Sequence, residues 1–169
     1  MPMRITNKTA KWIIIIYTII VSVIIFSLPA EAKEFSDLSE QARKDYITNL
    51  TEQISKDLGI QTIPKLYFYN CSEWCVIASY YDCIDYIYVN LGNINSYEDA
   101  VRTMAHEIRH DYQYEHINDD SDYGRAVKAN NQNYVSYYND LEAYNNQFIE
   151  QDAKDYADSY TEKYFNLVR

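Results

Sequence analysis

Residues 96–115 read SYEDAVRTMAHEIRHDYQYE and carry the strongest structural signal in the chain. Ser96, followed three residues later by Asp99, forms a capping pattern that predicts a helix from Tyr97 to about Glu115. The predicted buried side has apolar residues at three- and four-residue spacing, namely Val101, Met104, Ala105, Ile108 and Tyr112.

This predicted helix contains His106-Glu107-Ile108-Arg109-His110, which matches the motif H-E-x-x-H. Residues four apart lie on one helix face one turn from each other, so His106 and His110 can both bind one zinc ion. Glu107 lies at the edge of that face, where a carboxylate can take a proton from a metal-bound water. The motif therefore predicts a Zn²⁺ site with Glu107 as catalytic base. The competing interpretation is a solvated helix face on which Glu and Arg form ion pairs.

A site with two histidines needs a third protein ligand. His116 follows His106 by ten residues, as in the metzincin pattern, but Gln113 replaces the glycine that lets the chain turn there. No methionine follows the motif, although a metzincin carries one in a turn downstream. In a continuous helix His116 would lie roughly 15 Å along the axis from His106. We therefore expect His116 at a solvent-exposed helix end.

A carboxylate from a later helix is the better candidate for the third ligand. Apolar spacing predicts a long helix over about residues 134–165, in which Glu150 shares one face with Asn146, Ala153 and Ala157. Small residues on that face allow close packing against the metal-binding helix. The sequence thus predicts Glu150 as the third ligand. The next candidates are Glu142 and Asp155.

With these residues the chain resembles a zinc metallopeptidase of the gluzincin type, and in particular the minimal bacterial zincins that include the ImmA/IrrE-like peptidases. In that group a helical H-E-x-x-H is followed by the pattern E-x-x-A-x-x-aromatic-A, which matches Glu150, Ala153, Tyr156 and Ala157. The resemblance implies hydrolysis of a peptide bond by a zinc-activated water. It implies that the zinc ligands are His106, His110 and Glu150. It also implies that Glu107 is the catalytic base.

The remaining segments predict an α+β fold of the minimal zincin type. Apolar spacing from Leu38 to Leu58, closed by Gly59, predicts an N-terminal amphipathic helix. Residues 118–133 are rich in Asn, Asp, Ser and Gly and predict a solvated loop. Three runs rich in β-branched and aromatic residues predict a small, mostly antiparallel sheet of strands at Leu66–Tyr69, Val76–Tyr81 and Ile84–Leu91.

Three further features of the site are expected with alternatives left open. The strand Ile84–Leu91 leads into the metal-binding helix and could pair with an extended substrate as an edge strand. A tyrosine hydroxyl could hold the oxyanion, and the candidates are Tyr134, Tyr137 and Tyr138. Three neighbouring cysteines predict a local disulfide with one spare thiol, the pairing being open among Cys71, Cys75 and Cys83.

The N-terminal segment predicts export. Three basic residues precede an uncharged apolar run from Trp12 to Leu28, and Ala30-Glu31-Ala32 provides a small-x-small cleavage pattern. We expect a signal peptide over residues 1–32, with an uncleaved membrane anchor as the alternative. A single domain over residues 33–169 is expected outside the cytoplasm, either secreted or anchored to the outer face of the cytoplasmic membrane by the apolar run.

Composition limits the possible partners. The 169 residues include 15 Lys+Arg against 25 Asp+Glu, a net charge of −10, so the chain would repel the phosphates of nucleic acids. We therefore expect a peptide or protein substrate. Nineteen tyrosines favour contact surfaces. The alternative to an exported zinc metallopeptidase is thus an exported or membrane-tethered, tyrosine-rich binding or adhesion domain without catalytic activity.

Overall fold

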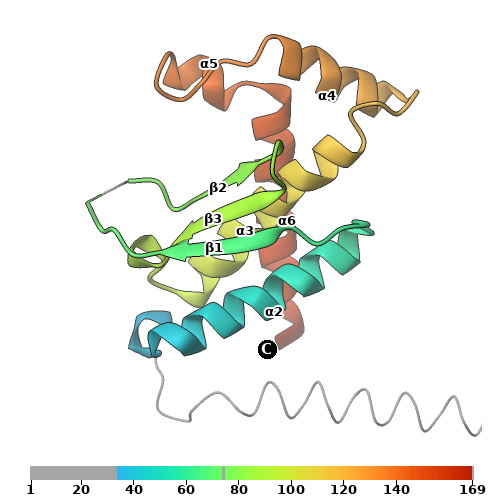
Figure 1. Cartoon of the computed structure of the whole chain (residues 1–169). Coiled ribbons are helices and arrows are strands. Elements are labelled where there is room, and N and C mark those ends of the chain that lie inside the picture. The colour runs from blue at the N-terminus through green and yellow to red at the C-terminus, as the bar shows by residue number, and fades with distance from the viewer. Residues whose placement is uncertain (1–33, 74, 169) are drawn as a thin grey trace, which may run out of the picture. The chain divides into compact units, whose positions relative to one another are not determined.

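A computed structural model describes residues 34–73 and 75–168 (Figure 1). The predicted signal peptide or anchor lies outside these residues. Within the two ranges, no helix has both the length and the apolar character that a membrane span requires. The elements in chain order are η1 (Phe35–Asp37), α2 (Glu40–Leu58), β1 (Lys65–Tyr69), β2 (Ala78–Tyr81), β3 (Tyr86–Asn90), η2 (Leu91–Asn93), α3 (Tyr97–Glu115), α4 (Asp122–Gln132), α5 (Leu141–Asn145) and α6 (Phe148–Val168).

The general class is α+β, as expected: an N-terminal helix, a small sheet, and then helices that end in a long one. Ser39 caps α2 by accepting a hydrogen bond from the Ala42 N–H, and Gly59 ends it in the left-handed region at φ 76°. Glycine adopts that conformation without a steric penalty, which is why the helix stops there. The buried apolar side chains of α2 are Ile47, Leu50 and Ile54.

The sheet differs from the predicted one in strand order and direction. Its order is β1-β3-β2, with β1 parallel to β3 and β2 antiparallel to β3. The sheet is therefore mixed, and the expectation of a mostly antiparallel sheet is corrected. Strand β3 lies in the centre, so the prediction that this segment forms an edge was wrong. The edge strand nearer α3 is β2, because it contacts that helix directly.

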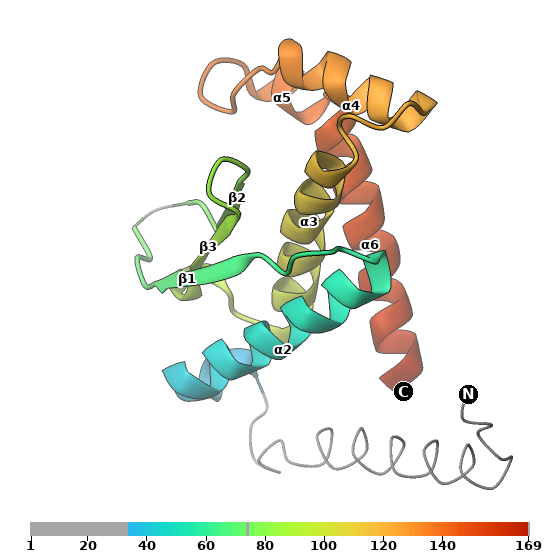
Figure 2. The same cartoon turned by 45° about the vertical axis from the view of Figure 1, so that its right-hand side comes forward.

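Helix α3 organises the rest of the fold and has the predicted bounds. Ser96 accepts a hydrogen bond from the Asp99 N–H, and the Asp99 carboxylate accepts one from the Ser96 N–H, so the predicted capping pattern is a complete capping box. The helix contacts α2, β2 and α6, and it lies between the sheet and α6 (Figure 2). Its fully buried side chains include Val101, Met104, Ala105 and Ile108.

The segment after α3 departs from the prediction in two places. Residues 118–133 are not a loop, because α4 forms there with Ser121 as its cap. Gly124 in α4 lies so close to the turn after α3 that a Cβ would be 2.6 Å from two carbonyl oxygens, so the close approach of α4 requires a glycine. The predicted long helix over residues 134–165 is in fact two helices, α5 and α6.

Candidate metal centre

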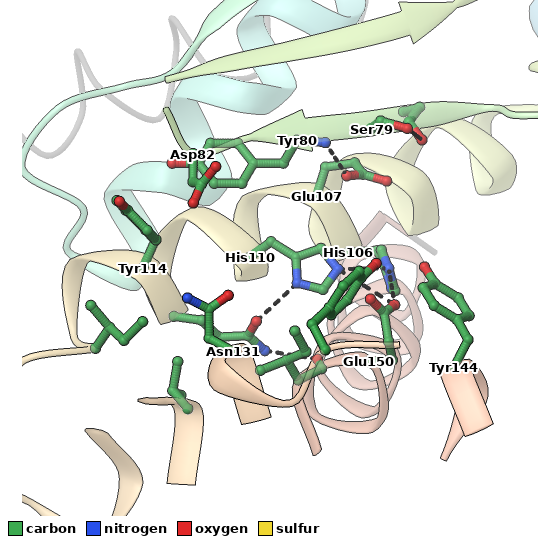
Figure 3. A pocket seen from close by; sticks show the side chains of 16 residues that line it. Ser79, Tyr80, Asp82, His106, Glu107, His110, Tyr114, Asn131, Tyr144 and Glu150 are labelled. Carbon is green, nitrogen blue, oxygen red and sulfur yellow. Dashed lines mark hydrogen bonds and ion pairs between the residues drawn. The ribbon is translucent and has the colours of Figure 1, made fainter. Parts of the chain in front are cut away.

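His106, His110 and Glu150 bring one ligand atom each to a common point (Figure 3). The two Nε2 atoms of the histidines are 3.1 Å apart, and Glu150 Oε2 lies 3.5 Å from His106 Nε2 and 3.6 Å from His110 Nε2. Tetrahedral zinc with bonds of about 2.0–2.1 Å separates its ligands by about 3.3 Å. The donor set and its spacing therefore fit such an ion. Among the residues that the structure describes, this is the one group of three side chains able to hold a metal.

The fold positions these ligands from two helices. The histidines lie one turn apart on α3, and Glu150 lies in the first turn of α6. Ala153 and Ala157 are buried, and small side chains there allow α6 to approach α3 closely. Burial would raise the pKa of Glu150, but hydrogen bonds with the two histidines outweigh it and lower that pKa to about 2. Glu150 therefore presents an anionic oxygen to the site.

Gln113 fixes the orientation of His110. The Gln113 amide nitrogen donates to the Ile149 carbonyl and to Asp152 Oδ2, both at 2.8 Å, so its carbonyl oxygen faces His110 Nδ1 at 2.9 Å. A carbonyl oxygen only accepts, and His110 therefore carries a proton on Nδ1. In the neutral ring that a metal ion requires, Nε2 is then the nitrogen with the lone pair, and it lies on the side of Glu150.

Asp152 connects the three helices around the site. Two residues after Glu150, it accepts two hydrogen bonds from the Arg109 guanidinium, at 2.8 and 2.9 Å, and one from the Tyr123 hydroxyl on α4 at 2.8 Å. Both charged groups are mostly buried, and Arg109 pairs across to α6 instead of along its own helix. For the motif residues Glu107 and Arg109, these contacts contradict the competing interpretation of a solvated helix face on which Glu and Arg form ion pairs.

We expect Gln113→Leu to lower metal affinity about 10- to 100-fold, because partners that orient a ligating histidine contribute that much. Competition with a chromophoric zinc chelator measures the affinity. Gln151→Leu, at an exposed position on α6, is the matched control and should leave it unchanged. Equal affinities in the two variants would contradict a positioning role for Gln113. Nitrogen chemical shifts of the His110 ring in the metal-free chain should also show loss of the single tautomer.

Glu107 lies beside the ligands and is held by the edge of the sheet. It is 8% exposed, and its Oε2 accepts a hydrogen bond from the Tyr80 N–H at 2.8 Å. The Asn90 N–H donates to the Ile77 carbonyl, so the alternate residues of β2, Ala78 and Tyr80, direct their main-chain groups away from β3. The free edge of β2 therefore faces the site.

Two cavities meet at the site along this edge. One, of about 360 Å³, contains all three ligands and is also lined by Tyr80 and Asp82 of the hairpin and by Asn131 (Figure 3). Tyr134 belongs to the same lining. The other, of about 380 Å³, is lined by Ile77, Arg102 and Lys154, among others. Both linings include Ala78, His106 and Glu107. A chain lying along β2 would therefore have space on both sides of the ligands.

His116 and the exposed acidic candidates are not part of the ligand group. His116 is the C-terminal cap of α3, where its Nδ1 donates to the Tyr112 carbonyl at 2.8 Å and its ring stacks on that of Tyr112. Glu142 and Asp155 are exposed and lie outside the group.

Only one of the three tyrosine candidates lines the ligand cavity. All three are exposed, but Tyr134 lines the cavity, whereas Tyr137 and Tyr138 do not. Tyr144, which was not predicted, also lines the cavity and hydrogen-bonds Glu150. No sequence pattern marks it, because it belongs to the short helix α5 inside a segment predicted as one long helix.

All three cysteines are free thiols in the structure, with Cys75 and Cys83 exposed and Cys71 half-buried. Asn90 organises the segment between Cys71 and β2: its side chain accepts from the Cys71 N–H and donates to the carbonyls of Cys71 and Val76. The pairing of the cysteines stays a prediction.

Comparisons of the chain with models of known families, with curated proteins and with solved structures give no match. The function is therefore argued from the geometry and chemistry of the site.

Proposed function

We propose that this chain is a zinc-dependent peptidase. The observation that carries the proposal is the cluster of His106, His110 and Glu150 ligand atoms at 3.1–3.6 Å with Glu107 beside it, inside a cavity. Two imidazoles and one carboxylate are the protein ligands of a catalytic zinc that keeps a fourth position open. A zinc ion held there would polarise the substrate carbonyl and lower the pKa of its water to about 7.

Glu107 is the proposed general base. Its carboxylate lines both cavities and lies near enough to His110 to raise that residue's pKa, together with Glu150 and against the effect of burial. From this position it takes the proton of the attacking water and passes it to the leaving amine. The Tyr80 N–H holds one carboxylate oxygen, which leaves the other to face the cavity.

The edge strand β2 is the proposed substrate platform, in place of the central strand β3. Ala78 directs both its main-chain groups to the free edge, and Tyr80 directs its carbonyl there, so an extended peptide can add to the sheet by main-chain hydrogen bonds. The cavities on both sides of Glu107 supply room for the side chains of such a peptide. This arrangement supports a polypeptide substrate over a small molecule.

Tyr134 is the proposed donor to the oxyanion. It lines the ligand cavity, and burial followed by the charges of Glu150 and Glu107 raises the pKa of its phenol, so the group stays protonated and can donate. Tyr144 lines the same cavity, but its hydroxyl already hydrogen-bonds Glu150. Tyr134 is therefore the better donor to the oxyanion.

The order of elements also supports the resemblance to a minimal zincin: a helix, a small sheet with an edge strand facing the site, the H-E-x-x-H helix, and a later helix with the glutamate. From this order of elements and the predicted export segment, we infer an extracytoplasmic enzyme that acts on proteins or peptides. The acidic net charge of −10 gives no support to a nucleic-acid substrate.

Metal analysis of the purified chain tests the proposal. We expect about one zinc per chain, lost in His110→Ala, together with hydrolysis of a denatured protein substrate that stops on chelation and returns with zinc. His116→Ala is the matched control, because it removes a histidine of the same helix end without touching the ligand group. A metal-free chain that is as stable as the zinc-treated one would overturn the proposal.

One observation favours the alternative function. On the face of the sheet that points away from α3, the ring of Tyr88 lies 5.0 Å from that of Tyr67 and 5.1 Å from that of Tyr81. Tyr67 is 55% exposed and Tyr81 48%. Such an aromatic face suits a binding or adhesion domain. A chain that neither binds added zinc nor hydrolyses the substrate in its presence would favour that alternative.

A further inference from the structure

Tyr80 has acidic partners besides Glu107. Its hydroxyl donates to Asp111 Oδ1 at 3.2 Å and also hydrogen-bonds Asp85. Asp82, which Figure 3 shows near the ring of Tyr80, adds a third carboxylate that acts on this hydroxyl. The carboxylates come from α3 and from the turn between β2 and β3, two segments that the fold brings together around one side chain.

Two oxygens of this cluster are buried without a partner. Asp111 is 3% exposed, and its Oδ2 has no hydrogen-bond partner; the same holds for Asp85 Oδ1. A tyrosine hydroxyl has one proton and can donate to only one of the two carboxylates at a time. A buried carboxylate oxygen without a partner is costly, so the arrangement lacks a positive group at this point.

The surrounding side chains do not supply that positive charge to Asp111. The groups that act on Asp111 are the carboxylates of Asp85 and Glu115 and the hydroxyl of Tyr80. Lys65 offsets part of the charge at Asp85. Carboxylates therefore outnumber cations around this cluster.

We propose that Asp85 and Asp111 bind a calcium ion, separate from the metal centre. Calcium prefers oxygen ligands, takes six to eight of them, and completes its shell with main-chain carbonyls and water. Two carboxylates with few other charged ligands correspond to a weak site, with a Kd of roughly 0.1–1 mM, as in extracellular modules.

The site is connected to the proposed catalytic residue through Tyr80. The side chain of Tyr80 reaches Asp111, while its main-chain N–H holds Glu107, one turn earlier on α3. An ion bound at the carboxylates fixes the end of β2 and the hairpin turn against α3. Calcium binding therefore stabilises the edge strand that holds Glu107.

Thermal unfolding with and without calcium tests the proposal. At ten times Kd, calcium should raise the Tm of the wild-type chain by about 4 °C, since binding to the folded state stabilises it by mass action. Asp111→Asn and Asp85→Asn should lose this shift; asparagine also tolerates the left-handed conformation of Asp85, at φ 54°. Asp120→Asn, at a fully exposed carboxylate, is the matched control and should keep the shift.

His106→Ala separates this site from the metal centre, because the calcium shift should persist when a zinc ligand is removed and the peptidase activity is lost. Terbium luminescence excited through tyrosine should give the same ranking of variants and should be competed away by calcium. The absence of a shift in wild type at 5 mM calcium, with Asp111→Asn at least as stable as wild type, would show that Asp111 holds a proton instead. A shift retained in both aspartate variants, or lost in His106→Ala alone, would also overturn the proposal.

Discussion

Glu107→Gln is expected to lower the rate of peptide hydrolysis by about 100-fold or more while the chain keeps its zinc. The amide cannot take a proton from water, and a positioned general base contributes about 10²- to 10⁴-fold to such a reaction. The substitution is a mild one for the fold, because the glutamine oxygen can still accept the hydrogen bond of the Tyr80 N–H. The measurement is kcat/KM on a quenched peptide together with the zinc content of the same sample.

Glu142→Gln is the matched control for this experiment, since Glu142 is exposed on α5 and outside the ligand group. It should retain wild-type turnover and zinc. Unchanged turnover in Glu107→Gln would reject Glu107 as the base. A loss of zinc from that variant would instead show that Glu107 acts through the metal site.

The metal-binding helix could be predicted from sequence because its signals are local and agree with one another. The Ser96 and Asp99 capping box, the apolar spacing and the four-residue spacing of His106 and His110 all depend on residues less than two turns apart. All three signals indicate the same helix. The bounds of α3 and the placing of both histidines on one face therefore followed directly from the sequence.

Residues 118–147 were predicted poorly because the same residue types start helices and fill loops. Ser121 and Asp140 are caps of α4 and α5, where side-chain oxygens accept from main-chain N–H groups. Judged by composition alone, Ser121 and Asp140 are residues typical of loops. The break between α5 and α6 is fixed from a distance, because the Gln147 side chain both accepts from the Val135 N–H and donates to the Val135 carbonyl.

Strand order and the partners of the ligands depend on tertiary contacts. Periodicity indicates that β1, β2 and β3 are strands, but not that β3 lies between the other two. In the same way, Gln113 was noted only for not being a glycine, whereas it orients His110 through a bond network that includes Asp152. The three-residue spacing of His110 and Gln113 was the one local signal of this contact.

Glu150, the proposed third ligand, and His116, which lies outside the ligand group, are expected to respond differently to alanine substitution. Glu150→Ala should lower zinc affinity by more than about 100-fold, because loss of a direct ligand should cost at least as much as loss of a residue that only orients one. His116→Ala should leave the affinity nearly unchanged, since the His116 ring stacks on Tyr112 and its Nδ1 bonds the Tyr112 carbonyl. Zinc titration against a competing chelator gives both values.

Folding has to be separated from ligation in Glu150→Ala, because Glu150 and Asp152 lie in the same part of α6 and Asp152 connects that helix to Arg109. Circular dichroism and thermal unfolding of the metal-free variants provide this control. In a folded Glu150→Ala chain, excess zinc should restore activity only in part, because the two remaining histidines supply neither the charge nor the enforced geometry of the complete site. The reverse ranking, with zinc affinity lost in His116→Ala and kept in Glu150→Ala, would place the third ligand at the end of α3 and require that end to turn back toward the histidines.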